Sequence, residues 1–379
     1  MKKILHLDIG QNRIFGLDLL RMLAILFVVF SHSAAILPSG IYSFFDLFYF
    51  DGVCIFFVLS GFLIGSIIIR SVEKNGFSRS ELFVFWIRRW FRTLPNYYLF
   101  VIILAVLSKI FIAGFPLRTI TPFLFFCQNI FTSNDSFFGE SWSLSVEEWF
   151  YFSIPLFLFL LVRLFNIKFS RALLMVSVVL LLLSTYLRYH VYAHHTFLEM
   201  GDYRRVVIMR MDNLMYGVIG AYIAYYHQNF WAVIRHRAMI MGIALVLIWK
   251  YFIYQYPSIE SFYYINIFYP LFCTAILCLL PVLSRYTLKN YGYWAKAVSY
   301  ISLISYSLYL IHYSLVKKLF IDHIFYSFFE GEDLFSIIIK NLFYWCASLL
   351  GALLIYKYFE IPTMKLRDKI RLKNNAPHK

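Results

Sequence analysis

The stretch 21–32, RMLAILFVVFSH, places a guanidinium and an imidazole at the two ends of a strongly apolar run. On an α-helix these eleven steps advance about 16 Å and return to within about 20° of the starting face. Ionisable groups inside a membrane are costly, and they normally face the protein interior or a wet cavity. The stretch therefore predicts a membrane-spanning helix with one polar edge. For this pair taken alone, snorkelling of Arg21, or its pairing with Asp18, and a structural hydrogen bond for His32 are equally acceptable explanations.

The whole chain has the composition of a membrane protein. Of its 379 residues, 61% are hydrophobic and only 15% are charged, which lies outside the range of soluble domains. Apolar runs of about 20 residues recur along the length, separated by short polar breaks. We expect one all-α integral membrane domain over 1–379, a polytopic bundle of about ten helices. The expected spans are 14–36, 44–69, 95–113, 146–165, 172–188, 211–227, 238–255, 263–283, 299–317 and 334–358.

The net charge of +15 follows the predicted topology. Most lysines and arginines outside the spans fall on the N-terminal side, so the positive-inside rule places both termini in the cytoplasm. We expect a short cytoplasmic segment at 1–13, a basic loop at 70–92 and a basic cytoplasmic tail at 359–379. Basic residues divided among loops of one membrane face suit anionic lipid and exclude a nucleic-acid partner. The first apolar run is too long, and too charged at Asp18 and Arg21, for a cleavable signal peptide.

Cysteine and histidine spacing gives no metal or redox signal. The five cysteines lie in or beside apolar runs without ligand spacing, so neither a disulfide framework nor a zinc site is expected. His190, His194 and His195 have compatible spacing, but we interpret them as solvated residues of an outer loop. Gly61 and Gly65, with Ser60, form a small-residue pattern that predicts close helix packing. The chain shows no internal repeat, which weakens a transporter built from duplicated halves.

Several motifs occur in one order along nearly the whole chain. They are LDLLRMLAILFVVFSH at 17–32, GVCIFFVLSGFLI at 52–64, RRWFRTLPNYY at 88–98, QN at 128–129, SWSLSVEEWFYF at 141–152, RMDNLMYG at 210–217, SYSLYLIH at 305–312 and FEIP at 359–362. In this set the chain resembles the acyltransferase-3 family of membrane acyltransferases, many of which O-acetylate cell-surface glycans. The resemblance implies a bacterial inner-membrane enzyme with cytoplasmic acetyl-CoA as acyl donor.

The chain departs from the family pattern twice. Leu19 replaces the glycine of the usual Asp-Gly-Leu-Arg, and Cys54 replaces the aspartate of the usual Gly-Val-Asp. The second change removes a carboxylate from the second span. Asp51 is close in sequence, but helical geometry aims it in a different direction.

Acyl transfer to a hydroxyl needs a base and a stabiliser for the oxyanion. His32 is the expected base, because its pKa range suits the task and it lies near the outer side; the resemblance implies the same role. Glu147 is the second expected catalytic residue, orienting His32 or binding a sugar hydroxyl. The alternative for Glu147 is an interfacial acid in an aromatic belt.

Acetyl-CoA has an anionic nucleotide end, for which arginine is well suited. The expected donor-binding residues are Arg21, Arg88, Arg89 and Arg92. The three later arginines are equally explicable as positive-inside anchors, and Arg21 as a partner of Asp18. Arg210 and Asp212 are expected to form an ion pair or to contact the acceptor, and His312 is a second intramembrane histidine with either a site role or a packing role.

The sequence thus predicts a membrane O-acyltransferase that moves acetyl from acetyl-CoA to a hydroxyl of an envelope or lipid-linked glycan. The acceptor hydroxyl attacks directly with His32 as base, or through an acyl-histidine. Expected partners are the acyl-CoA donor, the saccharide acceptor and membrane lipid, with a homo-oligomer possible in principle and no metal or redox cofactor. The main alternative is a lipid or sugar transporter or flippase, which would consume no donor. A glycan polymerase would call for a larger outer loop.

Overall fold

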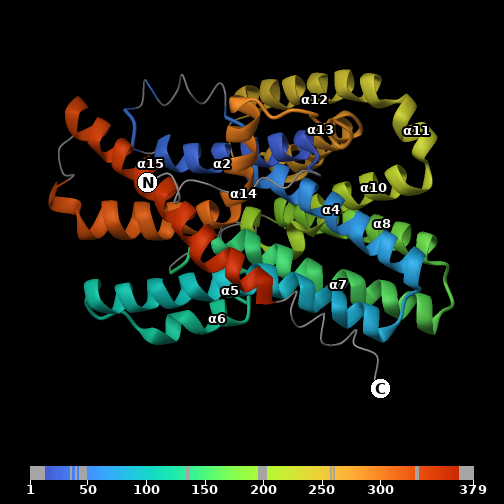
Figure 1. Ribbon diagram of the computed structural model, residues 1–379, viewed down its shortest axis with the longest axis horizontal. Helices are drawn as coiled ribbons and strands as arrows, with labels where there is room; N and C mark the ends of the chain where they lie inside the picture. Colours follow the sequence, from blue (N-terminus) through green and yellow to red (C-terminus); the bar gives the residue numbers. More distant parts are fainter. Residues whose placement is uncertain are drawn as a thin grey trace.

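The computed structural model describes residues 13–34, 36–38, 41, 49–133, 137–194, 203–256, 258, 261–328 and 333–366. Every regular element in these ranges is a helix (Figure 1). The all-α polytopic bundle expected from the sequence is therefore confirmed.

Eight helical segments are long and apolar enough to cross a membrane within the described ranges. They are α2 (Phe15–Ala34), α4 (Gly52–Asn75), α5 (Arg79–Phe111), α7 (Ser141–Leu164), α8 (Phe169–His194), α12 (Arg235–Gln255), the segment Tyr263–Leu283 that contains α13 (Phe268–Leu283), and the segment Leu334–Leu366 that contains α15 (Leu334–Ile355). The other two predicted spans fall on α10 (Met211–Tyr226) and on α14 (Tyr293–Ile311), which continues as the π-helix η5 (His312–Ile324). Short helices α6 (Thr121–Leu124) and α11 (Gln228–Val233) connect longer ones.

The prediction of a basic loop at 70–92 is wrong, because almost all of these residues are helical. Helix α4 continues to Asn75, and Gly76 ends it with φ of +75°. Ser78 then starts α5 by accepting a hydrogen bond from the backbone N–H of Glu81 at 3.2 Å, which is one half of a capping box. Arginine and lysine are good helix formers, so the basic residues extend the helix beyond its apolar part.

Two other boundaries also differ from the prediction. Helix α8 runs to His194, so His190 and His194 lie on a helix and not in a loop, while His195 lies outside the described residues. The helical segment that contains α15 continues to Leu366, so the predicted tail does not begin at residue 359. Glu360 is buried there and accepts hydrogen bonds from Asn96 at 3.0 Å and Ser307 at 2.6 Å.

Helices α4 and α10 pack with their backbones almost in contact (Figure 1). A Cβ atom on Gly61 would lie 1.9 Å from the carbonyl oxygen of Leu214, and one on Gly217 would lie 2.0 Å from that of Val58. Only glycine permits this approach. The close packing expected from the small residues around Gly61 is confirmed.

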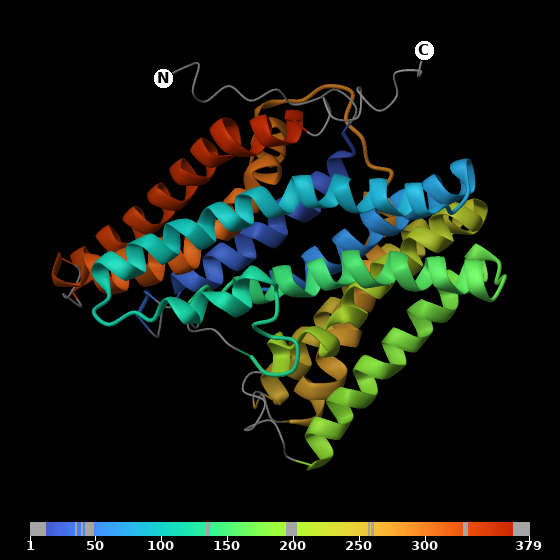
Figure 2. The same cartoon turned by 90° about the horizontal axis from the view of Figure 1, so that it is seen from below.

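Helix α2, which contains residues 21–32, packs against both α4 and α14. Figure 2 shows the long helices α5 and α7 running alongside each other, with α5 in front of α2 in that view. Residues far apart in sequence are thereby brought around one helix. The side chains discussed below come mainly from α2, α4, α5, α7 and α14.

Candidate functional site

His32 lies near the C-terminal end of α2 and contacts a second histidine. Its Nδ1 is 2.9 Å from Nε2 of His312, and its ring stacks on Tyr313 with centroids 4.2 Å apart and planes at 28°. Nδ1 of His312 is in turn 2.8 Å from the backbone carbonyl oxygen of Tyr309. The two imidazoles thus form a chain that ends on the backbone.

This chain determines the tautomers of both rings when they are neutral. A carbonyl oxygen can only accept, so Nδ1 of His312 carries the proton and its Nε2 is the acceptor. Nδ1 of His32 must then donate, which leaves the lone pair on Nε2 of His32. That nitrogen makes no hydrogen bond to any described residue, and the His32 ring lines a pocket. An imidazole oriented in this way is suited to take a proton from a ligand.

We call this cavity of about 200 Å³ the histidine pocket. Its wall includes His32, Trp142, Arg204, Arg205, Arg210 and Tyr313. Pockets that enclose a whole drug-sized ligand usually measure about 300–1,000 Å³. The histidine pocket therefore suits one end of a larger molecule.

A second cavity of about 380 Å³, the arginine pocket, lies further toward the N-terminal end of α2. Arg13, Arg21, Arg89, Arg92 and Glu147 are in its wall. Val53 and Tyr309 line both pockets. The walls of the two pockets therefore share this pair of side chains, and we call this place the junction.

Tyr309 is held rigidly at that junction. Its hydroxyl is 2.6 Å from Oγ of Ser143 and donates to the backbone oxygen of Glu140 at 2.9 Å. Val53, by contrast, is a half-buried aliphatic side chain on α4. Of the two, Val53 is the residue whose size can be changed without breaking a hydrogen bond.

Asp18 connects Arg13 and Arg21 to α14. It accepts a hydrogen bond from Nε of Arg13 at 2.6 Å and from Oγ of Ser302 at 2.9 Å, and it lies 3.7 Å from Nη1 of Arg21. Arg21 therefore pairs with Asp18 and also lines the arginine pocket, so both interpretations of this residue match its position. Arg13 was not selected from the sequence, because it precedes the apolar run and has no motif of its own.

The three arginines of α5 are not equivalent. Arg89 and Arg92 line the arginine pocket, whereas Arg88 is exposed and lines neither pocket. Arg92 makes no hydrogen bond or ion pair with the residues that the structure describes. Its charge is available to a ligand.

Glu147 lies in the arginine pocket and not beside His32. It accepts hydrogen bonds from Oγ of Ser60 at 2.8 Å and from the hydroxyl of Tyr151 at 3.0 Å. Its neighbour Glu148 accepts one from Thr93 at 2.6 Å. The side chain that contacts Nδ1 of His32 is His312, and Glu147 lies in the other pocket.

Glu140 is a buried acid that the sequence analysis missed. It lies just before the membrane-spanning helix α7 and accepts a hydrogen bond from the backbone N–H of Ser314 at 3.0 Å. It thereby fixes the start of the π-helix that carries His312 and Tyr313. Burial raises the pKa of Glu140 to about 7, although the hydrogen bonds from Ser314 act in the opposite direction.

This raised pKa predicts a pH dependence of stability. The folded state holds the Glu140 proton up to about pH 7, while an unfolded glutamate loses it near its usual value of 4.5. The folded state therefore binds more protons in this window, and its stability falls as the pH rises. We expect Glu140→Gln, which keeps an oxygen acceptor for Ser314, to lessen the fall in Tm of the detergent-solubilised protein between pH 5 and pH 7. Equal slopes for the two proteins would contradict this assignment.

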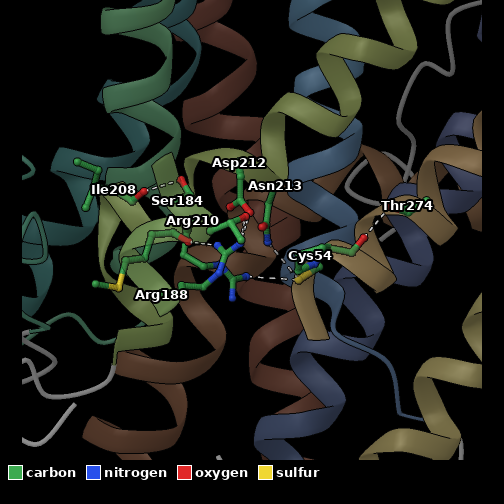
Figure 3. Close-up of polar contacts among 11 residues, drawn as sticks. Cys54, Ser184, Arg188, Ile208, Arg210, Asp212, Asn213 and Thr274 are labelled. Carbon is green, nitrogen blue, oxygen red and sulfur yellow. Dashed lines mark hydrogen bonds and ion pairs between the residues drawn. The ribbon is translucent and has the colours of Figure 1, made fainter. Parts of the chain in front are cut away.

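The motif at 210–217 supplies a buried ion pair, but not the predicted one. Asp212 accepts from Arg188 at 2.6 Å, and both side chains are fully buried. The prediction of an ion pair between Arg210 and Asp212 is therefore wrong. Arg188 comes from α8, which sequence spacing could not bring next to Asp212. Figure 3 shows the Arg188–Asp212 pair, with Arg210 turned toward Cys54.

Within the described part of the chain, no group of three or more His, Cys, Asp or Glu side chains could hold a metal ion. The arrangement offers an oriented imidazole in one pocket, arginines in the other, and two side chains that belong to both walls.

Comparison with known proteins adds a family match. The family model described as an acyltransferase domain, acyltransferase-3, matches residues 14–357. Peptidoglycan O-acetyltransferase OatA of Listeria monocytogenes is 33% identical over 165 residues, which are 39% of this chain and 24% of that protein. A putative O-acetyltransferase of Staphylococcus aureus is 27% identical over 225 residues, which are 55% of this chain and 34% of that protein.

An uncharacterized protein of Haemophilus influenzae is 28% identical over 197 residues, covering 46% of this chain and 74% of that protein. The aligned part thus spans about a quarter of the Listeria protein and a third of the Staphylococcus one. No solved structure matches the chain.

Proposed function

Because the chain belongs to the acyltransferase-3 family, we propose that it is a membrane O-acetyltransferase that moves acetyl from acetyl-CoA to a hydroxyl of a cell-envelope or lipid-linked glycan. The observation that carries this proposal is the pair of pockets that meet at Val53 and Tyr309. One pocket has guanidiniums for an anionic donor, and the other has an imidazole with a free lone pair. The name of the Listeria relative supports a polysaccharide as acceptor class.

In the proposed reaction the arginine pocket opens to the cytoplasm and binds the donor. Arg92 and Arg89 bind phosphate oxygens of CoA, and the pantetheine arm extends toward Val53, where the thioester stops. The proposed setting is the inner membrane of a bacterium, with the histidine pocket facing outward.

His32 then acts from the histidine pocket. Its Nε2 accepts the proton of the acceptor hydroxyl while that oxygen attacks the acetyl carbonyl carbon. The C–O bond forms and the C–S bond breaks; the imidazolium of His32 then gives its proton to the sulfur, so that CoA leaves as the thiol and His32 returns to its neutral form. His312 accepts from Nδ1 of His32 throughout, which stabilises the charge on the imidazolium. The same Nε2 could instead attack the thioester and carry the acetyl group; both routes need the tautomer that His312 imposes.

Transfer of label from acetyl-CoA by the purified protein tests the proposal directly. A transporter or flippase, the alternative from another class, would leave acetyl-CoA intact under the same conditions.

Arg92 provides a specific test of the donor site. A hydrogen bond to a charged group contributes about 1.5–3 kcal/mol, so Arg92→Gln should raise KM for acetyl-CoA about tenfold or more with a small effect on kcat. Arg88→Gln is the matched control, since Arg88 lies on the same helix but lines neither pocket. Steady-state kinetics on both variants decide the matter; an equal rise in KM for both would assign these arginines to membrane anchoring.

A further inference from the structure

Arg210 brings a positive charge into the wall of the histidine pocket. The residue is 1% exposed. Its Nη2 lies 3.4 Å from Sγ of Cys54, and its guanidinium lies over the rings of Tyr269, at 3.7 Å, and Trp142, at 5.4 Å. Figure 3 shows the contact with Cys54. With the ring of Phe57 at 5.6 Å, these neighbours are a thiol and three aromatic rings, and none of them carries a compensating charge.

The described acids around the pocket have other hydrogen-bond partners, although the charge of Asp51 also attracts Arg210 from a distance. Asp212 is bonded to Arg188. Asp51 accepts from the backbone N–H of Cys54 at 2.9 Å and so caps α4. Glu140 accepts from Ser314. Among the residues that the structure describes, Arg210 forms no ion pair.

A buried charge without a counterion is costly, because desolvation is not offset by an opposite charge. A guanidinium also has five donors in a planar fork that matches a carboxylate or a phosphate. Arg204 and Arg205 line the same pocket, so its wall contains three arginines as well as His32. An oxyanion in this pocket would lie in a positively charged environment.

We propose that the histidine pocket binds an acceptor with an anionic group, a carboxylate or a phosphate, and that Arg210 and Arg205 hold this group next to His32. The role of this anionic ligand as acceptor rests on the proposed function, whereas its binding to the histidine pocket does not. The pocket would select acidic saccharides over neutral ones of the same size.

Binding tests this without relying on catalysis. The probes are methyl glucuronide and glucose 6-phosphate, with methyl glucoside as the neutral counterpart, each titrated by calorimetry into the full chain in lipid nanodiscs. We expect Kd for at least one anionic probe to be about tenfold lower than for the neutral sugar, which corresponds to about 1.4 kcal/mol. The two anionic probes separate a carboxylate from a phosphate ligand. Equal affinity for all three sugars would overturn the proposal.

Two variants locate the effect. Cys54→Asp places a carboxylate beside Arg210 with little change in side-chain size, and this internal anion should abolish the preference for the anionic probes. Cys127→Asp is the matched control, because Cys127 is an exposed cysteine that lines neither pocket. Arg205→Gln, at a less buried position than Arg210, should weaken anionic binding severalfold without changing the neutral sugar. A Cys54→Asp variant that keeps the full preference would show that the anion binds elsewhere.

The two proposals fail in different ways. Loss of the anionic preference with continued acetyl transfer would overturn only the inference about the acceptor. Anionic binding without any consumption of acetyl-CoA would overturn only the proposed enzyme.

Discussion

Replacing His32 with glutamine is expected to lower kcat for acetyl transfer by about 10²–10⁴, the range that a positioned general base usually contributes. Acetyl-CoA binding should persist, because His32 is absent from the arginine pocket. The measurement is the kcat and the acetyl-CoA dissociation constant of the purified variant. His190→Gln is the control, since His190 is an exposed histidine on α8 outside both pockets.

His312 extends this prediction to a positioning residue. Glutamine at position 312 still offers a carbonyl oxygen to Nδ1 of His32, whereas leucine offers none. His312→Gln should therefore keep more activity than His312→Leu, and the leucine variant should change the pH profile of kcat because the tautomer of His32 is no longer set. Equal activities of the two variants, with unchanged profiles, would show that the contact between the histidines has no part in the reaction.

Val53→Phe is expected to reduce acetyl transfer at least tenfold while leaving the affinity for acetyl-CoA within about twofold. Val53 lines both pockets. A phenyl ring at this position should therefore block the route by which the acetyl group must reach His32. Tyr309, the other side chain shared by the two walls, is fixed by two hydrogen bonds and therefore cannot easily move aside for the ring. One expects kcat, and not KM, to carry the loss.

The matched control is Val178→Phe, the same change at an exposed position of α8. In the opposite direction, Val53→Ala should raise the rate with propionyl-CoA relative to acetyl-CoA. Normal transfer by Val53→Phe would show that the acyl group does not pass this junction.

The sequence was sufficient to predict a membrane helix bundle, because the hydropathy of each segment depends on its own residues and not on tertiary contacts. The segment 21–32 predicted α2, and the small residues around Gly61 predicted its close approach to Leu214. The same reasoning failed at 70–92: a hydropathy criterion ends a span at the first charges, while the helix itself ends only where Gly76 and Ser78 interrupt the backbone.

The candidate site could be predicted only in part. The motif spacing selected His32, Arg21, Arg89 and Arg92, and the structure places them around two adjoining pockets. Motif spacing could not show that His312, 280 residues from His32, contacts Nδ1 of His32; orienting His32 was one of the two roles expected of Glu147. Nor could it show that Asp212 forms its ion pair with Arg188 and not with Arg210. Such pairings depend on how helices pack, and no local pattern records them.

In the proposed reaction, acetyl passes from a donor on one side of the membrane to an acceptor on the other, through the junction at Val53 and Tyr309. Sealed proteoliposomes test it, with an impermeant saccharide acceptor enclosed and labelled acetyl-CoA added only outside. The account predicts labelled acceptor inside the vesicles, with the released CoA remaining outside, and at least tenfold less labelling with Val53→Phe. Label that reaches the acceptor only when donor and acceptor share one compartment would contradict it.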